Sequence, residues 1–315
     1  MKRAKTPNMI SGEVPPWGQM DEGLLADLTS QQIPLDWRPR QALPYQKWLD
    51  ARMRDISTHL WPLYVPGGSA WNTGTVKRLF DVDFRLLAAL HSHLRLPING
   101  FYGSTVIHSD FFAEEDDDNI GFGLNYERYD PTLDPLVGSQ LRDVLRAGYT
   151  DKVGTIDLQL KRAFQRPRPW QVAFIQRRST YQYRWAATAD TSSLVSGHCL
   201  QGLIGVCSVY AEFRSLMTKR SIQVLEQFAG DIGDRRVFAG VHYPSDNLSS
   251  WYMASALLPH VFKSSSVPAV KRFMKNAIEK RSAVFSAIKD SIRADKNSPY
   301  KWLVKAIASN LRPRN

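Results

Sequence analysis

Apolar side chains recur at helical spacing along several stretches of the chain. Leucine, phenylalanine and alanine residues spaced three or four positions apart predict helices over residues 76–96, 134–146 and 155–164. A further amphipathic helix is predicted over 270–292, with most of its lysines away from the apolar face. That apolar face comprises Val270, Phe273, Met274, Ala277, Ile278, Val284, Phe285 and Ile288.

Evidence for strands is weak by comparison. Only residues 99–109, with their glycines, aromatic and β-branched residues, indicate a short hairpin, and no series of alternating runs supports a sheet. Residues 1–75 are rich in proline and tryptophan, which predicts an irregular wrapping layer with short helical pieces at most. We therefore expect a mainly α protein in which residues 76–315 form a helical bundle, the whole chain being one structural unit.

The amphipathic helix over 270–292 admits two interpretations. A basic helix with one apolar face can lie on an anionic membrane surface, so peripheral membrane contact stays open as an alternative. Such a helix more often faces a protein core and exposes its charged side to water. We favour the core-facing interpretation.

Composition and charge narrow the class of partner. The 315 residues are 43% hydrophobic and 23% charged, as in an ordinary globular protein, and the net charge is +11. A strongly basic chain suits anionic partners, which include phosphate esters, nucleic acids and acidic membranes. No nucleic-acid-binding motif is visible, so we do not expect nucleic acid to be the partner. The sequence does not indicate an oligomeric state.

The apolar stretches around 200–210 and 251–262 are too short and interrupted to span a bilayer. The N-terminal region also lacks the apolar run of a secretory signal, and together these features predict a soluble, cytoplasmic protein. Cys199 and Cys207 lie eight residues apart on one predicted helix, too far to form a disulfide.

Three short segments carry the candidate chemistry. They are residues 161–169 (KRAFQRPRP), 196–198 (SGH) and 236–246 (RVFAGVHYPSD). Transfer of a phosphoryl group spreads negative charge over three oxygens, so arginine forks and a lysine charge suit its stabilisation. The candidate phosphate-binding residues are Lys161, Arg168, Ser196, Gly197 and Arg236. Ser196 and Gly197 follow polar residues 191–193 and begin a predicted helix through 213, whose first amides are expected to point at the anion.

The same segments contain two histidines and a carboxylate. His198 is placed to protonate a leaving oxygen. His242 can attack through one ring nitrogen only if the other carries the proton. Asp246 follows it by four residues, at the start of a helix predicted near residue 243, and can accept that N–H. The candidate catalytic residues are therefore His242, His198 and Asp246.

The order and spacing of these residues resemble the superfamily of type 2 phosphatidic acid phosphatases and vanadium haloperoxidases. The family pattern is Lys, six residues, Arg-Pro; then Pro-Ser-Gly-His; then Ser-Arg, five residues, His, three residues, Asp. Val195 replaces the usual proline and Arg235 the usual serine, which affects loop geometry and local charge more than reaction class. The resemblance covers roughly 134–262 and implies an all-helical fold. It also implies a metal-independent phosphatase that forms a phosphohistidine on His242.

Two other functions remain open. In a vanadium-dependent haloperoxidase the same site binds vanadate, and His242 would be its ligand. Fungal chloroperoxidases of the superfamily have tryptophan three residues before the lysine, where this chain has Leu158, and this difference favours hydrolysis. A non-enzymatic anion-binding or nucleic-acid-binding protein is suggested by the charge alone, and it leaves His198, His242 and Asp246 unexplained.

Two charged features lie outside the motif positions. The acidic run 114–118 suits a solvated loop, with a cation site or a lid as alternatives. Several further arginines surround the first motif and either line the pocket to steer anions or form a solvated basic face. They are Arg162, Arg166, Arg177, Arg178 and Arg184.

Overall fold

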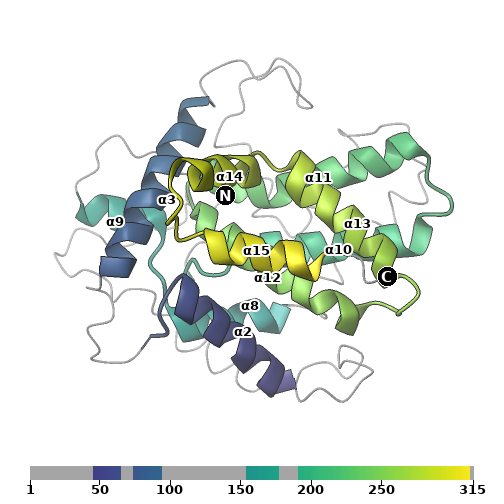
Figure 1. Ribbon diagram of the computed structural model, residues 1–315, viewed down its shortest axis with the longest axis horizontal. Coiled ribbons are helices and arrows are strands. Elements are labelled where there is room, and N and C mark those ends of the chain that lie inside the picture. Colours follow the sequence, from purple (N-terminus) through teal and green to yellow (C-terminus); the bar gives the residue numbers. More distant parts are fainter. Residues whose placement is uncertain (1–44, 65–73, 94–153, 177–190, 313–315) are drawn as a thin grey trace, which may run out of the picture.

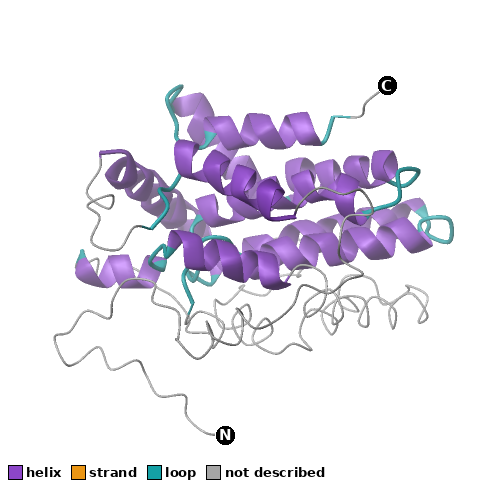
Figure 2. Cartoon of the chain, turned by 90° about the horizontal axis from the view of Figure 1, so that it is seen from below, coloured by secondary structure: helices purple, strands orange, loops and turns teal. Residues whose placement is uncertain are grey.

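The computed structural model describes residues 45–64, 74–93, 154–176 and 191–312. Throughout these residues the regular structure is helical, without a strand (Figure 2). The mainly α prediction is thus confirmed. The expected hairpin at 99–109, the helix at 134–146 and the acidic run 114–118 lie outside the described residues.

Three long helices form the centre of the bundle. They are α10 (Gly197–Phe213), α11 (Lys219–Phe238) and α12 (Pro244–Val261), and α10 packs against both of the others (Figure 1). The helices α10 and α11 begin after polar capping residues. The side chains of Ser196 and Thr218 each accept a backbone N–H of the first turn. Proline begins the third, where its missing N–H costs nothing. The helix starts predicted near residues 196 and 243 are confirmed.

Two glycines let α11 approach its neighbours closely. A Cβ at Gly233 would lie 2.7 Å from the Cys199 sulfur on α10, and one at Gly230 would lie 2.9 Å from the Ala277 carbonyl oxygen. Both distances are shorter than ordinary van der Waals contact. Cys199 and Cys207 are buried in this core as free thiols, as expected.

The single helix predicted over 270–292 is wrong in one respect. The segment forms α13 (Val267–Asn276), a π-helical turn (Ala277–Arg281) and α14 (Ala283–Ala294). The break falls at Ser282, because Asp234 of α11 accepts the Ser282 hydroxyl at 2.6 Å and the Ala283 N–H at 2.6 Å. The apolar residues of the segment are buried in the core, which confirms the core-facing interpretation.

Three more helices pack around this centre. α15 (Lys301–Asn310) lies along α12, whereas α3 (Gly74–His93) contacts α11, α12 and α14 (Figure 1). α2 (Tyr45–His59) contacts α15 and buries Leu49 and Ile56. The predicted helix over 76–96 is confirmed through residue 93. The expectation of short helical pieces at most in residues 1–75 is wrong, because α2 has four turns and an apolar face that packs on the core.

Two short helices, α8 (Gly154–Phe164) and α9 (Pro169–Ile175), carry the first motif. α8 matches the helix predicted over 155–164. In the described residues, no helix has the length and apolarity needed to cross a membrane.

Candidate active site

The first motif turns sharply after α8. Gln165 has a φ of 43°, in the left-handed region, and its N–H donates to the Lys161 carbonyl at 2.9 Å. This conformation ends the helix and directs the following residues inward. Arg166 and Arg168 are consequently both buried, on either side of Pro167.

The polar segment 191–193 holds the two motif cations. Lys161 Nζ donates to Thr191 Oγ1 at 3.0 Å and to the Ser192 carbonyl at 2.8 Å. Arg168 Nε donates to the Thr191 carbonyl at 2.7 Å. Ser193 binds back to the first motif, since its N–H donates to the Arg166 carbonyl at 2.9 Å. The segment before Ser196 therefore fixes the positions of Lys161 and Arg168.

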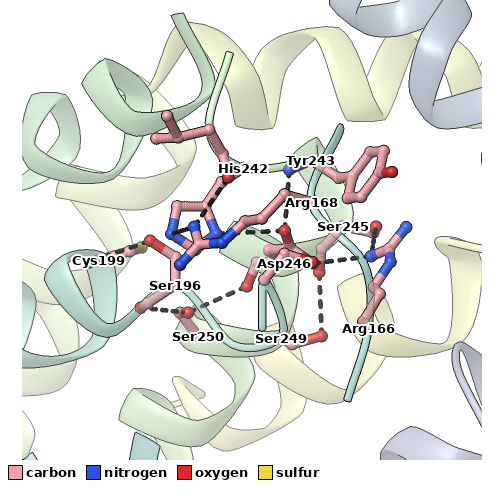
Figure 3. A network of polar contacts seen from close by, with 12 residues as sticks. Arg166, Arg168, Ser196, Cys199, His242, Tyr243, Ser245, Asp246, Ser249 and Ser250 are labelled. Carbon is pink, nitrogen blue, oxygen red and sulfur yellow. Dashed lines mark hydrogen bonds and ion pairs between the residues drawn. The ribbon is translucent and has the colours of Figure 1, made fainter. Parts of the chain in front are cut away.

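His242 lies between Arg168 and Asp246 (Figure 3). Its Nδ1 is 3.2 Å from Asp246 Oδ2, and its Nε2 is 2.8 Å from Arg168 Nη1. The same Asp246 oxygen accepts the Tyr243 N–H at 2.9 Å, which fixes the carboxylate at the first turn of α12. A proton on Nδ1 satisfies Asp246 and leaves a lone pair on Nε2, which faces the cation.

The electrostatic surroundings keep this imidazole neutral. Burial lowers the pKa of His242 well below its ordinary value, and the nearby cations Arg168, Lys161 and Arg236 lower it further. Burial likewise lowers the pKa of Lys161, with Arg168 acting in the same direction and Asp157 against it. Three basic groups thus surround His242, and a bound anion would relieve their mutual repulsion.

The start of α10 is joined to this group through α12. The Ser250 hydroxyl of α12 lies 2.8 Å from the Ser196 carbonyl oxygen and 3.0 Å from the Asp246 carbonyl oxygen, so these two acceptors share its one proton (Figure 3). Gly197 and His198 occupy the first two positions of α10, and the His198 side chain is buried. Arg236 is buried near the end of α11, where its carbonyl accepts the His242 N–H at 3.3 Å.

Gly197 has a structural role that the sequence did not indicate. A Cβ at this position would lie 2.3 Å from Asp157 Oδ2, so the Asp157 carboxyl occupies the space beside the glycine. Asp157 also accepts the Gln201 amide at 3.1 Å, and burial raises its pKa to about 6 against the opposing effect of Lys161. Its position four residues before Lys161 was a signal that could have identified it.

Arg166 differs most from expectation. Both interpretations of Arg166, as a pocket residue that steers anions and as part of a solvated basic face, are wrong, because its guanidinium is buried and paired with Asp83 and Asp246 at 2.7 Å each. Arg162 is exposed on α8, and Arg177, Arg178 and Arg184 lie outside the described residues. No group of three or more His, Cys, Asp or Glu side chains within the described ranges is arranged to hold a metal ion.

Comparison with known proteins gives one match. Residues 147–267 match the family described as the PAP2 superfamily. This range contains all eight candidate site residues, together with the helices that position them. No curated protein and no solved structure matches the chain.

Proposed function

We propose, from the match of residues 147–267 to the PAP2 superfamily, that the protein is a metal-independent phosphatase that forms a phosphohistidine on His242. The proposed substrates are small phosphate monoesters or diphosphate esters. In this reaction His242 Nε2 attacks phosphorus and the ester oxygen leaves with a proton from His198. Water then attacks the phosphohistidine, with His198 taking its proton.

One observation carries the proposal. His242 has Nδ1 directed at Asp246 and Nε2 directed at a cluster of cations, while its pKa is lowered. If His242 served only to bridge Asp246 and Arg168 by hydrogen bonds, an amide side chain could take its place. A nucleophile needs a neutral ring, a fixed tautomer and a nearby positive charge for the incoming oxyanion, and this arrangement supplies all three.

The remaining site residues suit the phosphoryl oxygens. Lys161, Arg168 and Arg236 supply the charge, and the amides near Ser196 and Gly197 at the start of α10 supply further donors. Asp246 holds the reactive tautomer of His242 without contacting the substrate. Because three cations already compensate the phosphate charge, the proposed reaction needs no metal ion.

A haloperoxidase with vanadate bound through His242 would use the same residues, so a paired assay tests the proposal. The purified protein is incubated with an aryl phosphate in excess chelator and, separately, with halide, peroxide and vanadate. We expect hydrolysis that survives chelator, is inhibited by vanadate and is abolished in His242→Ala. Activity lost with chelator and regained with magnesium would refute the metal-free reaction. Halide oxidation that requires vanadate, without hydrolysis, would establish the alternative.

A further inference from the structure

Arg166 stands apart from the phosphate-binding cations because both of its terminal nitrogens are bound to carboxylates. Nη1 donates to Asp246 Oδ1 at 2.7 Å and Nη2 donates to Asp83 Oδ2 at 2.7 Å. The side chains of all three residues are completely buried. Its guanidinium also lies 4.0 Å from the centroid of the Tyr243 ring and 4.8 Å from that of Trp61.

Stabilisation of the fold does not by itself account for a buried charge cluster of this kind. Desolvating three charged groups costs about as much as their attraction returns, so apolar residues of similar size often serve stability equally well. Removing one partner alone, in contrast, leaves an uncompensated buried charge. The position of Arg166 therefore suggests a role in what Asp246 does.

The two carboxylate oxygens of Asp246 contact different side chains. Oδ2 faces His242 Nδ1 at 3.2 Å, and Oδ1 is held by Arg166 on the opposite side (Figure 3). Rotation of the carboxylate about its Cβ–Cγ bond would break both contacts. By holding Oδ1, Arg166 fixes the plane in which Oδ2 meets the imidazole, and its charge compensates that of the fully buried carboxylate.

Residues outside the matched segment 147–267 hold the Arg166 side chain in place. Asp83 of α3 accepts the Ser245 hydroxyl at 2.6 Å and the Ser245 N–H at 3.2 Å, in addition to Arg166. The Tyr300 hydroxyl, next to α15, donates to Asp83 Oδ1 at 2.7 Å. The guanidinium is consequently locked between two helices, with little freedom to change its hold on Asp246.

We propose that Arg166 is a positioning residue that acts through Asp246 to hold the reactive tautomer of His242. This proposal rests on the proposed phosphatase reaction. In it Arg166 touches neither substrate nor reacting atoms, whereas Lys161, Arg168 and Arg236 retain the binding of the anion.

The kinetic test compares Arg166→Met, which removes the charge, with Arg166→Lys, which keeps the charge but cannot hold both carboxylates in a fork. We expect kcat to fall by about 100-fold or more in Arg166→Met, as in other disrupted acid–histidine pairs, and by less in Arg166→Lys. Competitive inhibition by inorganic phosphate should change only a few-fold, because the anion-binding cations remain. Wild-type kcat in Arg166→Lys or Arg166→Met would overturn the proposal.

Two further variants separate positioning from folding. Arg166→Met should add little to the loss already caused by Asp246→Asn, since both disrupt one pathway to His242, whereas full additivity would contradict the proposal. Tyr252→Phe is the matched control on the same helix as Asp246: it removes the bond from the Tyr252 hydroxyl to Asp55 of α2 and leaves the Arg166–Asp246 contact. It should lower the melting temperature and keep kcat within about two-fold. A loss of kcat proportional to the loss of stability across all these variants would show a structural role only.

A readout independent of turnover distinguishes failure of this proposal from failure of the proposed function. Nitrogen NMR of protein labelled in its seven histidines, assigned with His242→Gln, reports which ring nitrogen of His242 carries the proton. We expect the Nδ1–H tautomer in the wild type and a mixture of tautomers in Arg166→Lys. An unchanged tautomer in that variant would overturn the positioning role, even if the wild type hydrolysed no ester.

Discussion

At the scale of single residues, the proposed reaction gives the two histidines different tasks. His242→Ala should abolish turnover of every ester, because no other residue replaces the nucleophile. His198→Ala should slow alkyl phosphates by about 100-fold or more, since their leaving oxygens need a proton, and slow aryl phosphates much less. Rates for a series of esters with increasing leaving-group pKa measure this. His260→Ala, at the far end of α12, should leave the series unchanged, and equal losses on all esters for His198→Ala would remove its assignment as the acid.

Gly197 and Asp157 allow a second test at the residue scale. The added methyl group of Gly197→Ala would overlap the Asp157 carboxyl, because its Cβ would lie 2.3 Å from Oδ2 and 3.3 Å from Cγ. We expect this variant to lose stability by about 1–3 kcal/mol, as in overpacked cores. Asp157→Ala removes both clashing atoms and leaves only a Cβ at 3.8 Å.

The double variant Gly197→Ala/Asp157→Ala should therefore be more stable than Gly197→Ala alone, as measured by urea unfolding. If the two changes are additive, Asp157 does not determine the need for glycine, and close approach of a bound phosphate becomes the better explanation for it. Activity of the double variant separates these explanations further. Restored stability without restored turnover would show that glycine is needed at position 197 both for the space taken by Asp157 and for close approach of a bound phosphate.

At the scale of the elements, a buried carboxyl controls where α14 begins. Asp234 accepts the Ser282 hydroxyl and the N–H groups of Ala283 and Val284, and burial raises its pKa to about 8. In the unfolded chain an aspartate has its ordinary pKa near 4. Between these values the folded protein holds a proton that the unfolded chain releases, so stability should fall as the pH rises toward 8.

Asp234→Asn removes this titration and retains acceptor and donor atoms for the start of α14. We expect the stability of the variant relative to the wild type to increase between pH 5 and 8, by at most about 1.4 kcal/mol per pH unit. Urea unfolding at pH 5, 6.5 and 8 measures the difference. Asp290→Asn, an exposed carboxyl on α14, should show no such trend. A constant difference between Asp234→Asn and the wild type across this range would show that Asp234 is not protonated in the folded protein.

The elements also show which features the sequence could predict. The helix starts at Ser196 and Pro244 depend on neighbours within a few positions and are predicted correctly. The contact of 3.2 Å between His242 and Asp246 is equally local, since four residues separate them. The break at Ser282 depends on Asp234, 48 residues earlier, so periodicity alone suggested one continuous helix. The buried environment of Arg166 is not predicted for the same reason, because its partner Asp83 is 83 residues away and Tyr300 lies 217 residues beyond Asp83. Contacts of that range leave no local pattern.

At the scale of the whole molecule, the matched segment 147–267 depends on helices outside it. α3 contacts α11 and α12, α15 lies along α12, and Arg78 of α3 forms an ion pair of 2.7 Å with Asp295, just after α14. The residues behind the proposed nucleophile, Asp83 and Tyr300, come from these outer parts. We therefore expect the described helices to unfold as one unit, in line with the single structural unit that the sequence predicts.

Leu303 of α15 tests this expectation. Its side chain is completely buried in the common core, about as far along the chain from the motifs as the described helices extend. Leu303→Ala should lower the free energy of unfolding by about 2–5 kcal/mol, through lost burial and the cavity left behind. Lys305→Ala, exposed on the same helix, should change it by less than about 0.5 kcal/mol. If the described helices form one cooperative unit, Leu303→Ala shifts a single transition, and helical circular dichroism and the proposed phosphatase activity are lost together. Two transitions, with activity persisting after the first, would instead show that α15 unfolds separately and that the site does not need its support.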